Sequence, residues 1–286
     1  MEPRQMKIRK HKLIISSLVA AFGVTFFSLI GTLMASEIVA SQAVVMPERS
    51  WYSNYDDLEV LGLTTFEANF DGIDENFEHT NGTIYLTFDD GPGEYTDRLL
   101  DILKSYNVKA TFFVTGKGDD ATIKREYDEG HTVALHTFSH RYDLVYRSVE
   151  AYFNDLNQVA ERVKNITGEE AKIIRFPGGS SNAVSAKYDG GIRIMSILSQ
   201  EVLNRGYVYF DWNVASGDAA SASTSDAVFV NVAAHLKEGA NVVLQHDIKG
   251  YSVDAVGRII EYGLANGYDF QPLKVDSPVV RHGVNN

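Results

Sequence analysis

Short apolar runs alternate with longer amphipathic runs from Thr83 onward, and this alternation restricts the fold more than any other feature of the sequence. The runs that read as strands are 83–88, 109–114, 131–135, 172–176, 207–212, 241–245 and 268–272. Helical spacing is clearest between them in 96–106, 149–167, 192–204, 226–237 and 253–266. This order predicts an α/β fold with a parallel sheet. About seven units in so short a span favour a closed or nearly closed barrel, and an open doubly wound sheet is the alternative.

The N-terminus carries a second pattern. Five cations within residues 4–12 precede the uncharged run 13–35, which is long enough to cross a bilayer as a helix. The basic flank predicts a cytoplasmic start and places the rest of the chain outside. We therefore expect a single-pass protein of the cell membrane. A cleaved signal peptide, and hence secretion, is the alternative, although signal-peptide apolar cores usually span only about 7–15 residues.

Composition separates the chain after residue 35 into segments and excludes some classes of function. Residues 36–80 are acidic and read as an extracellular spacer, 81–275 as the domain that carries the strand and helix pattern, and 276–286 as a tail. The net charge of -12 argues against a general nucleic-acid binder, which needs a basic surface. The chain has no cysteine, so it has neither a disulfide framework nor a thiolate metal site.

Reactive side chains lie at the ends of five separate predicted strands or directly after them. They are Asp89 and Asp90, His136 and His140, Arg175, Asp211 with Trp212, and His246 with Asp247. In parallel α/β folds the carboxyl ends of the strands converge on one face, where chemistry collects. Any one of these residues could be part of a turn or a solvated surface, but five strands delivering such groups to one rim indicate an active site.

His136 and His140 are spaced i, i+4, which would bring two imidazoles to the same side of a helical turn and to one metal. With one aspartate they would supply three protein ligands and leave room for water, as catalytic metal sites do. His246-Asp247 also suggests a phosphohydrolase of the His-Asp type, but that class needs further histidines on helices, which this spacing does not supply.

Five motifs, in order, resemble those of the polysaccharide deacetylase family, carbohydrate esterase family 4, which contains the NodB homology domain. The matching residues are 87–92 (Thr-Phe-Asp-Asp-Gly-Pro), 136–140 (His-Thr-Phe-Ser-His), 175–179 (Arg-Phe-Pro-Gly-Gly), 211–212 (Asp-Trp) and 244–247 (Leu-Gln-His-Asp). The resemblance covers about 81–275, and the third and fourth motifs resemble those of Gram-positive peptidoglycan N-acetylglucosamine deacetylases. It implies a distorted (β/α) barrel.

The resemblance also implies roles for these residues. Asp90, His136 and His140 would hold a divalent metal, with zinc as the expected ion and cobalt, nickel or manganese as alternatives. Asp89 would be the general base, held ionised by Arg175, and His246 the general acid, oriented by Asp211. Trp212 and Leu244 would wall the acetyl pocket. Many members have Tyr where this chain has Gly178, whose backbone N–H would still face the oxyanion. The fourth motif is also shortened here.

The function implied is metal-dependent removal of N-acetyl groups from a cell-wall polysaccharide, with peptidoglycan N-acetylglucosamine as the expected substrate. Two alternatives remain. One is an O-acetyl esterase acting on an acetylated glycan, and the other is a non-catalytic glycan-binding relative, against which the intact motifs count.

Overall fold

The computed structural model describes residues 81–286. The predicted membrane span 13–35 and the predicted spacer 36–80 lie outside the described residues. Among the helices within 81–286, none is both long and apolar enough to cross a membrane.

Eight parallel strands form one sheet within the described residues. They are β1 (Gly82–Asp89), β2 (Thr111–Val114), β3 (Thr132–Leu135), β4 (Ile173–Ile174), β5 (Val208–Tyr209), β6 (Val214–Ala215), β7 (Gly239–His246) and β8 (Tyr268–Phe270). Their order is β5-β4-β3-β2-β1-β7-β6, and β8 pairs with the start of β1. Each predicted strand overlaps one of these. Only β6 was missed, because a two-residue strand leaves no periodic pattern in the sequence.

The two end strands of this sheet are almost consecutive in the chain. β5 pairs with β4 and β6 pairs with β7, yet only residues 210–213 separate β5 from β6. One short extended segment therefore connects both ends of a curved sheet. The prediction of a parallel α/β fold is confirmed, in the form of a half-barrel consistent with a distorted (β/α) barrel.

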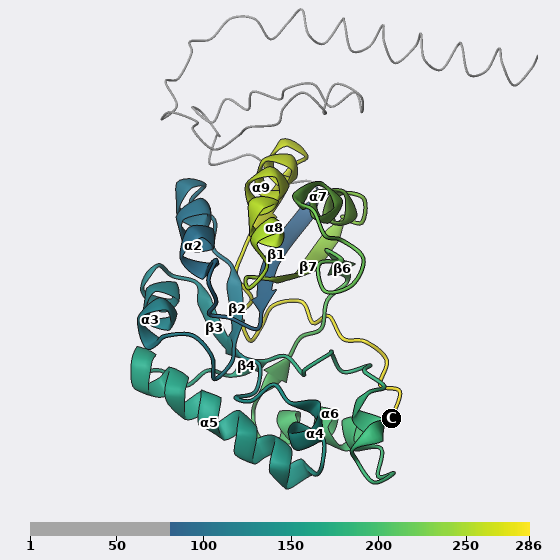
Figure 1. The fold of residues 1–286 in the computed structure, drawn as a ribbon. Helices are drawn as coiled ribbons and strands as arrows, with labels where there is room; N and C mark the ends of the chain where they lie inside the picture. Colours follow the sequence, from purple (N-terminus) through teal and green to yellow (C-terminus); the bar gives the residue numbers. More distant parts are fainter. Residues whose placement is uncertain (1–80) are drawn as a thin grey trace, which may run out of the picture. The chain divides into compact units, whose positions relative to one another are not determined.

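The helices connect successive strands and cover the outside of the sheet (Figure 1). They are α2 (Thr96–Ser105), α3 (Asp120–Asp128), α4 (Tyr142–Val145), α5 (Val149–Thr167), α6 (Ile194–Asn204), α7 (Ser225–Ala233), α8 (Gly250–Asp254) and α9 (Val256–Ala265), with a 3₁₀ turn η2 at Ser185–Lys187. Side chains that accept a backbone N–H cap three of them, namely Asp119 at α3, Ser148 at α5 and Thr224 at α7. Short capped helices of this kind return the chain to the amino end of the next strand.

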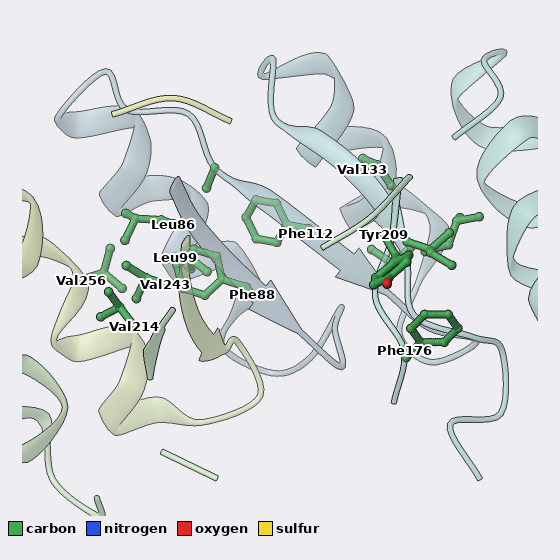
Figure 2. Packing of buried hydrophobic residues seen from close by; sticks show 14 of the residues in the cluster. Leu86, Phe88, Leu99, Phe112, Val133, Phe176, Tyr209, Val214, Val243 and Val256 are labelled. Atoms are coloured by element: carbon green, nitrogen blue, oxygen red, sulfur yellow. The ribbon is translucent and has the colours of Figure 1, made fainter. Parts of the chain in front are cut away.

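Two apolar layers hold the sheet. The larger lies between the sheet and the helices and includes Leu86, Leu99 and Val243 near β1 and β7 (Figure 2). The smaller lies on the other face of the sheet and is formed by residues such as Phe113, Phe210 and Val242. Because neighbouring positions on a strand face opposite sides, β7 buries Val242 in one layer and Val243 in the other. Apolar packing thus holds both faces of the sheet. It therefore also holds in place the carboxyl ends of the strands, which form the rim that carries the polar residues.

The C-terminal tail packs against the segment that joins β5 to β6. The N–H of Asp211 donates to the Val280 carbonyl at 2.9 Å, and the side chain of Val280 joins the smaller apolar layer. The tail ends beside α6, where the Asn286 carbonyl accepts from the Ser196 N–H at 2.7 Å (Figure 1). Residues 280–286 therefore line the open side of the half-barrel.

Candidate active site

Asp89 is the last residue of β1, and it is tied to a buried arginine. Arg175 follows β4 and is fully buried, and its Nη1 donates to Asp89 Oδ1 at 2.7 Å and pairs with the Thr87 hydroxyl at 2.8 Å. The rest of the guanidinium donates to the Phe210 and Asp211 carbonyls at 3.0 Å each. This ion pair places a permanent cation against the carboxylate that is predicted to be the general base. The predicted contact between Arg175 and Asp89 is present.

Asp90, His136 and His140 form a cluster beside Asp89. One ligand atom from each lies within 4.8 Å of the other two. Asp90 Oδ1 lies 3.3 Å from His140 Nε2 and 3.7 Å from His136 Nε2. The same Oδ1 is buried and has no hydrogen-bond partner among the described residues. A buried carboxylate oxygen between two imidazole nitrogens fits a divalent cation, which would satisfy all three groups.

The protonation of this cluster also suits a cation. His136 Nδ1 lies 2.8 Å from the Arg175 carbonyl, so Nδ1 carries the proton and Nε2 keeps its lone pair. Burial and the charge of His136 lower the pKa of His140 to about 4, which leaves its imidazole neutral near pH 7. Burial alone would raise the pKa of Asp90, but interaction with the imidazoles of His136 and His140 lowers it overall. His140 and Asp90 are therefore in the protonation states that metal ligands need.

The expectation that His136 and His140 share a helical turn is wrong. Both lie in the loop after β3, where Thr137 (φ 62°) and His140 (φ 51°) adopt the left-handed conformation. Asp155 of α5 holds the loop by accepting from the N–H groups of Phe138 and Ser139 at 2.6 and 3.0 Å. Left-handed non-glycine residues cost roughly 1–3 kcal/mol each and concentrate at functional sites. The conformation of this loop, and not helical spacing, places the two rings at a centroid distance of 4.8 Å.

His246, the last residue of β7, pairs in register with Asp89 across the neighbouring strands. Its Nδ1 lies 2.9 Å from Asp218 Oδ1, and its backbone N–H donates to Asp218 Oδ2 at 2.8 Å. Burial by itself would lower the pKa of His246, but the hydrogen bond to Asp218 and the charge of Asp89 outweigh it and raise the pKa to about 9. A protonated imidazole thus stands beside the carboxylate of Asp89.

The predicted role of Asp211 is wrong. It does not contact His246; Asp218 does. The buried Asp211 carboxylate instead accepts from the Ser180 N–H at 2.8 Å, the Ser180 hydroxyl at 2.5 Å and the His282 N–H at 2.8 Å. Asp211 therefore joins the loop after β4 to the C-terminal tail.

The three predicted substrate-binding residues lie at the same rim. Gly178 is exposed, with φ 76°, and its N–H donates to no acceptor among the described residues, so it is free to bind a ligand. Trp212 is half-buried, and its ring packs edge-on against His282 at 4.7 Å and beside Gly179. Leu244 is half-buried two residues before His246 on β7. Their contacts with a substrate remain predictions.

Sequence reasoning missed Asp218. It follows β6, the strand that the pattern did not reveal, within Ser216-Gly217-Asp218. A sequence of turn residues such as this one does not predict which histidine its aspartate will contact. The available signal was a second aspartate, Asp218, seven residues after Asp211.

A carboxylate paired with a buried arginine, a three-residue cluster suited to a cation and a protonated imidazole lie together at one end of a curved parallel sheet. Such a set of groups can carry out hydrolysis. The polysaccharide deacetylase family model matches residues 77–190. A peptidoglycan-N-acetylglucosamine deacetylase of Bacillus cereus is 34% identical over 205 residues, which cover 68% of this chain and 70% of that protein.

Solved structures agree. The catalytic domain of a peptidoglycan N-acetylglucosamine deacetylase from Eubacterium rectale is 52% identical, with a TM-score of 0.70, over 72% of this chain and 94% of that one. A polysaccharide deacetylase from Bacillus cereus is 32% identical, with a TM-score of 0.59, over 70% of this chain and 96% of that one. The chain belongs to the polysaccharide deacetylase family.

Proposed function

We propose that this chain is a metal-dependent N-deacetylase that releases acetate from N-acetylglucosamine residues of peptidoglycan. The observation that carries the proposal is the register of Asp89 and His246 on neighbouring strands, beside the Asp90–His136–His140 cluster. Asp89, as the base, and protonated His246, as the acid, would then act on the same bound acetyl group.

A divalent cation held by Asp90, His136 and His140 would acidify water and polarise the acetyl carbonyl, and zinc suits this mixed nitrogen and oxygen ligand set. Asp89, kept ionised by Arg175, takes the proton of the attacking water. The free N–H of Gly178 stabilises the negative charge that develops on the carbonyl oxygen. His246 gives its proton to the departing nitrogen, and Asp218 keeps the imidazole oriented and charged.

Amide rather than ester hydrolysis is favoured because His246 is protonated at neutral pH. An amine nitrogen is too basic to leave unprotonated, whereas an alkoxide leaves more readily, so an amidase depends more on a proton donor. The raised pKa of His246, about 9, keeps that donor charged at neutral pH. The relatives named above as peptidoglycan N-acetylglucosamine deacetylases support the choice of sugar.

Acetate release tests the proposal directly. The full-length chain, purified in detergent and loaded with zinc, should release acetate from N-acetylglucosamine oligomers and from peptidoglycan, and a chelator should abolish this activity. Activity on acetylated xylan with none on either N-acetylated substrate would favour the O-acetyl esterase alternative. Binding of glycan without acetate release would favour the non-catalytic alternative.

The proposed substrate requires the catalytic domain to lie outside the cell. The basic flank and the apolar run 13–35 support a single membrane span with residues 81–286 outside. A reporter that works only outside the membrane, fused after Asn286, should be active. A reporter that is active only in the cytoplasm would contradict both the topology and the cell-wall substrate.

A further inference from the structure

Tyr142 lies against Gly178, although the two residues come from different elements. Tyr142 begins α4, and Gly178 lies in the loop after β4. A Cβ built on Gly178 would lie 2.5 Å from the Tyr142 Oη and 3.3 Å from its Cε1. The ring of Tyr142 also packs edge-on against His140, with a centroid distance of 5.8 Å. The side chain of Tyr142 therefore reaches from the metal-ligand cluster to the loop of Gly178.

The hydroxyl of Tyr142 is available for a ligand. Within residues 81–286 it makes no hydrogen bond, and it is not among the buried polar atoms that lack a partner. Tyr146, four residues later, contrasts with it, because its buried hydroxyl donates to the Pro177 carbonyl at 2.7 Å. Packing alone would not require a hydroxyl at position 142, since a phenylalanine would fill the same space.

Two free donors thus lie side by side at the rim, the Tyr142 O–H and the Gly178 N–H. The phenol O–H and the peptide N–H can each donate a hydrogen bond. We propose that the Tyr142 hydroxyl is a second donor, beside the Gly178 N–H, to the acetyl carbonyl oxygen as that oxygen becomes negatively charged. This inference rests on the proposed deacetylation and adds a catalytic residue to it.

The position of the Tyr142 hydroxyl depends on the absence of a side chain at Gly178. Any Cβ there would overlap the phenol oxygen and push it away from the loop. Gly178 also has φ 76°, a conformation that a residue with a Cβ adopts only with strain. Gly178 and Tyr142 are therefore expected to behave as a coupled pair.

Tyr142→Phe in the full-length, zinc-loaded protein tests this role. Because amide and ester hydrolysis develop the same oxyanion, we expect kcat to fall about 10²–10³-fold on N-acetylglucosamine oligomers and equally on an activated aryl acetate. KM, zinc content and melting temperature should stay close to those of the unchanged protein. Tyr188→Phe, an exposed tyrosine outside the site, is the matched control and should retain full activity.

Other results would overturn the proposal. Unchanged kcat would mean that the hydroxyl only fills space, and a raised KM for oligomers alone would mean that it binds the sugar. Loss of zinc would mean that it acts through His140. Gly178→Ala provides a second test, because it should lower kcat on both substrates, and adding Tyr142→Phe should cost little more. If the unchanged protein released no acetate from any N-acetylated glycan, the proposed function would fail, yet the aryl acetate would still report on Tyr142.

Discussion

His246 Nδ1 lies 2.9 Å from the Oδ1 of Asp218, and the other Asp218 oxygen accepts the backbone N–H of His246 at 2.8 Å. Asp218 is itself held by the Ser252 hydroxyl, 2.7 Å from Oδ2. Both contacts fix the imidazole so that Nδ1 faces the carboxylate and Nε2 is left for the substrate. The pair therefore determines both the orientation and the charge of the proposed acid.

Asp218→Asn should lower kcat on N-acetylglucosamine oligomers and move the alkaline limb of the kcat–pH profile to lower pH. The substitution removes the negative charge that raises the pKa of His246 to about 9. Asp211→Asn should reduce activity on amide and aryl acetate alike without moving that limb, because Asp211 holds Ser180 and the tail. Rate–pH profiles of both variants check this, and a limb moved by Asp211→Asn alone would return the orienting role to Asp211.

The same pair links stability to pH in the metal-free protein. The folded-state pKa of His246, about 9, lies above the ordinary value of 6.5. Protonated His246 therefore stabilises the fold fully below about pH 6.5, and this contribution is lost as the pH rises through about 9. NMR titration of the imidazole together with urea denaturation at each pH measures it. A His246 pKa below 6.5 would contradict the assignment.

His246→Ala should reduce hydrolysis of N-acetylglucosamine oligomers by about 10²–10⁴-fold, the usual loss on removal of a general acid. An activated aryl acetate should be affected much less, because its leaving group departs without a proton. Steady-state kinetics on both substrates measure this difference. Equal losses would mean that His246 binds substrate or supports the structure.

Metal content should separate the two adjacent aspartates. Asp89→Asn should keep zinc bound and lose turnover, because it removes the base and leaves the ligands. Asp90→Asn and His136→Ala should lose the zinc itself. Metal analysis after dialysis checks this. An emptied site in Asp89→Asn with a full one in Asp90→Asn would exchange the two roles.

Arg175→Met should destabilise the fold by about 3–5 kcal/mol, because it leaves the carboxylate of Asp89 buried without its cation. Asp89→Asn in the same chain should recover part of that loss. Arg98→Met, which breaks an exposed ion pair with Asp254, is the matched control and should cost less than about 1 kcal/mol. Urea denaturation gives the three values, and similar losses for the two arginine variants would contradict the buried role.

Local sequence determined the fold class and much of the site. Periodicity located seven of the eight strands, because a strand that lies between two apolar layers must be apolar along most of its length. Residues at the ends of those strands, such as Asp89 and His246, could be assigned to one rim because parallel strands end on the same side of the sheet. The five ordered motifs then identified the family.

Tertiary structure decided which polar groups meet. Asp211 lies at the end of the predicted fifth strand and Asp218 follows that strand, and no local pattern shows which of them meets His246. Asp211 lies in the segment between β5 and β6 and contacts Ser180 and the tail, whereas Asp218 follows β6 and contacts His246. The contact between Tyr142 and Gly178 likewise depends on how α4 packs beside the loop after β4. Periodicity records only which side of an element is buried, whereas these contacts depend on how separate elements pack.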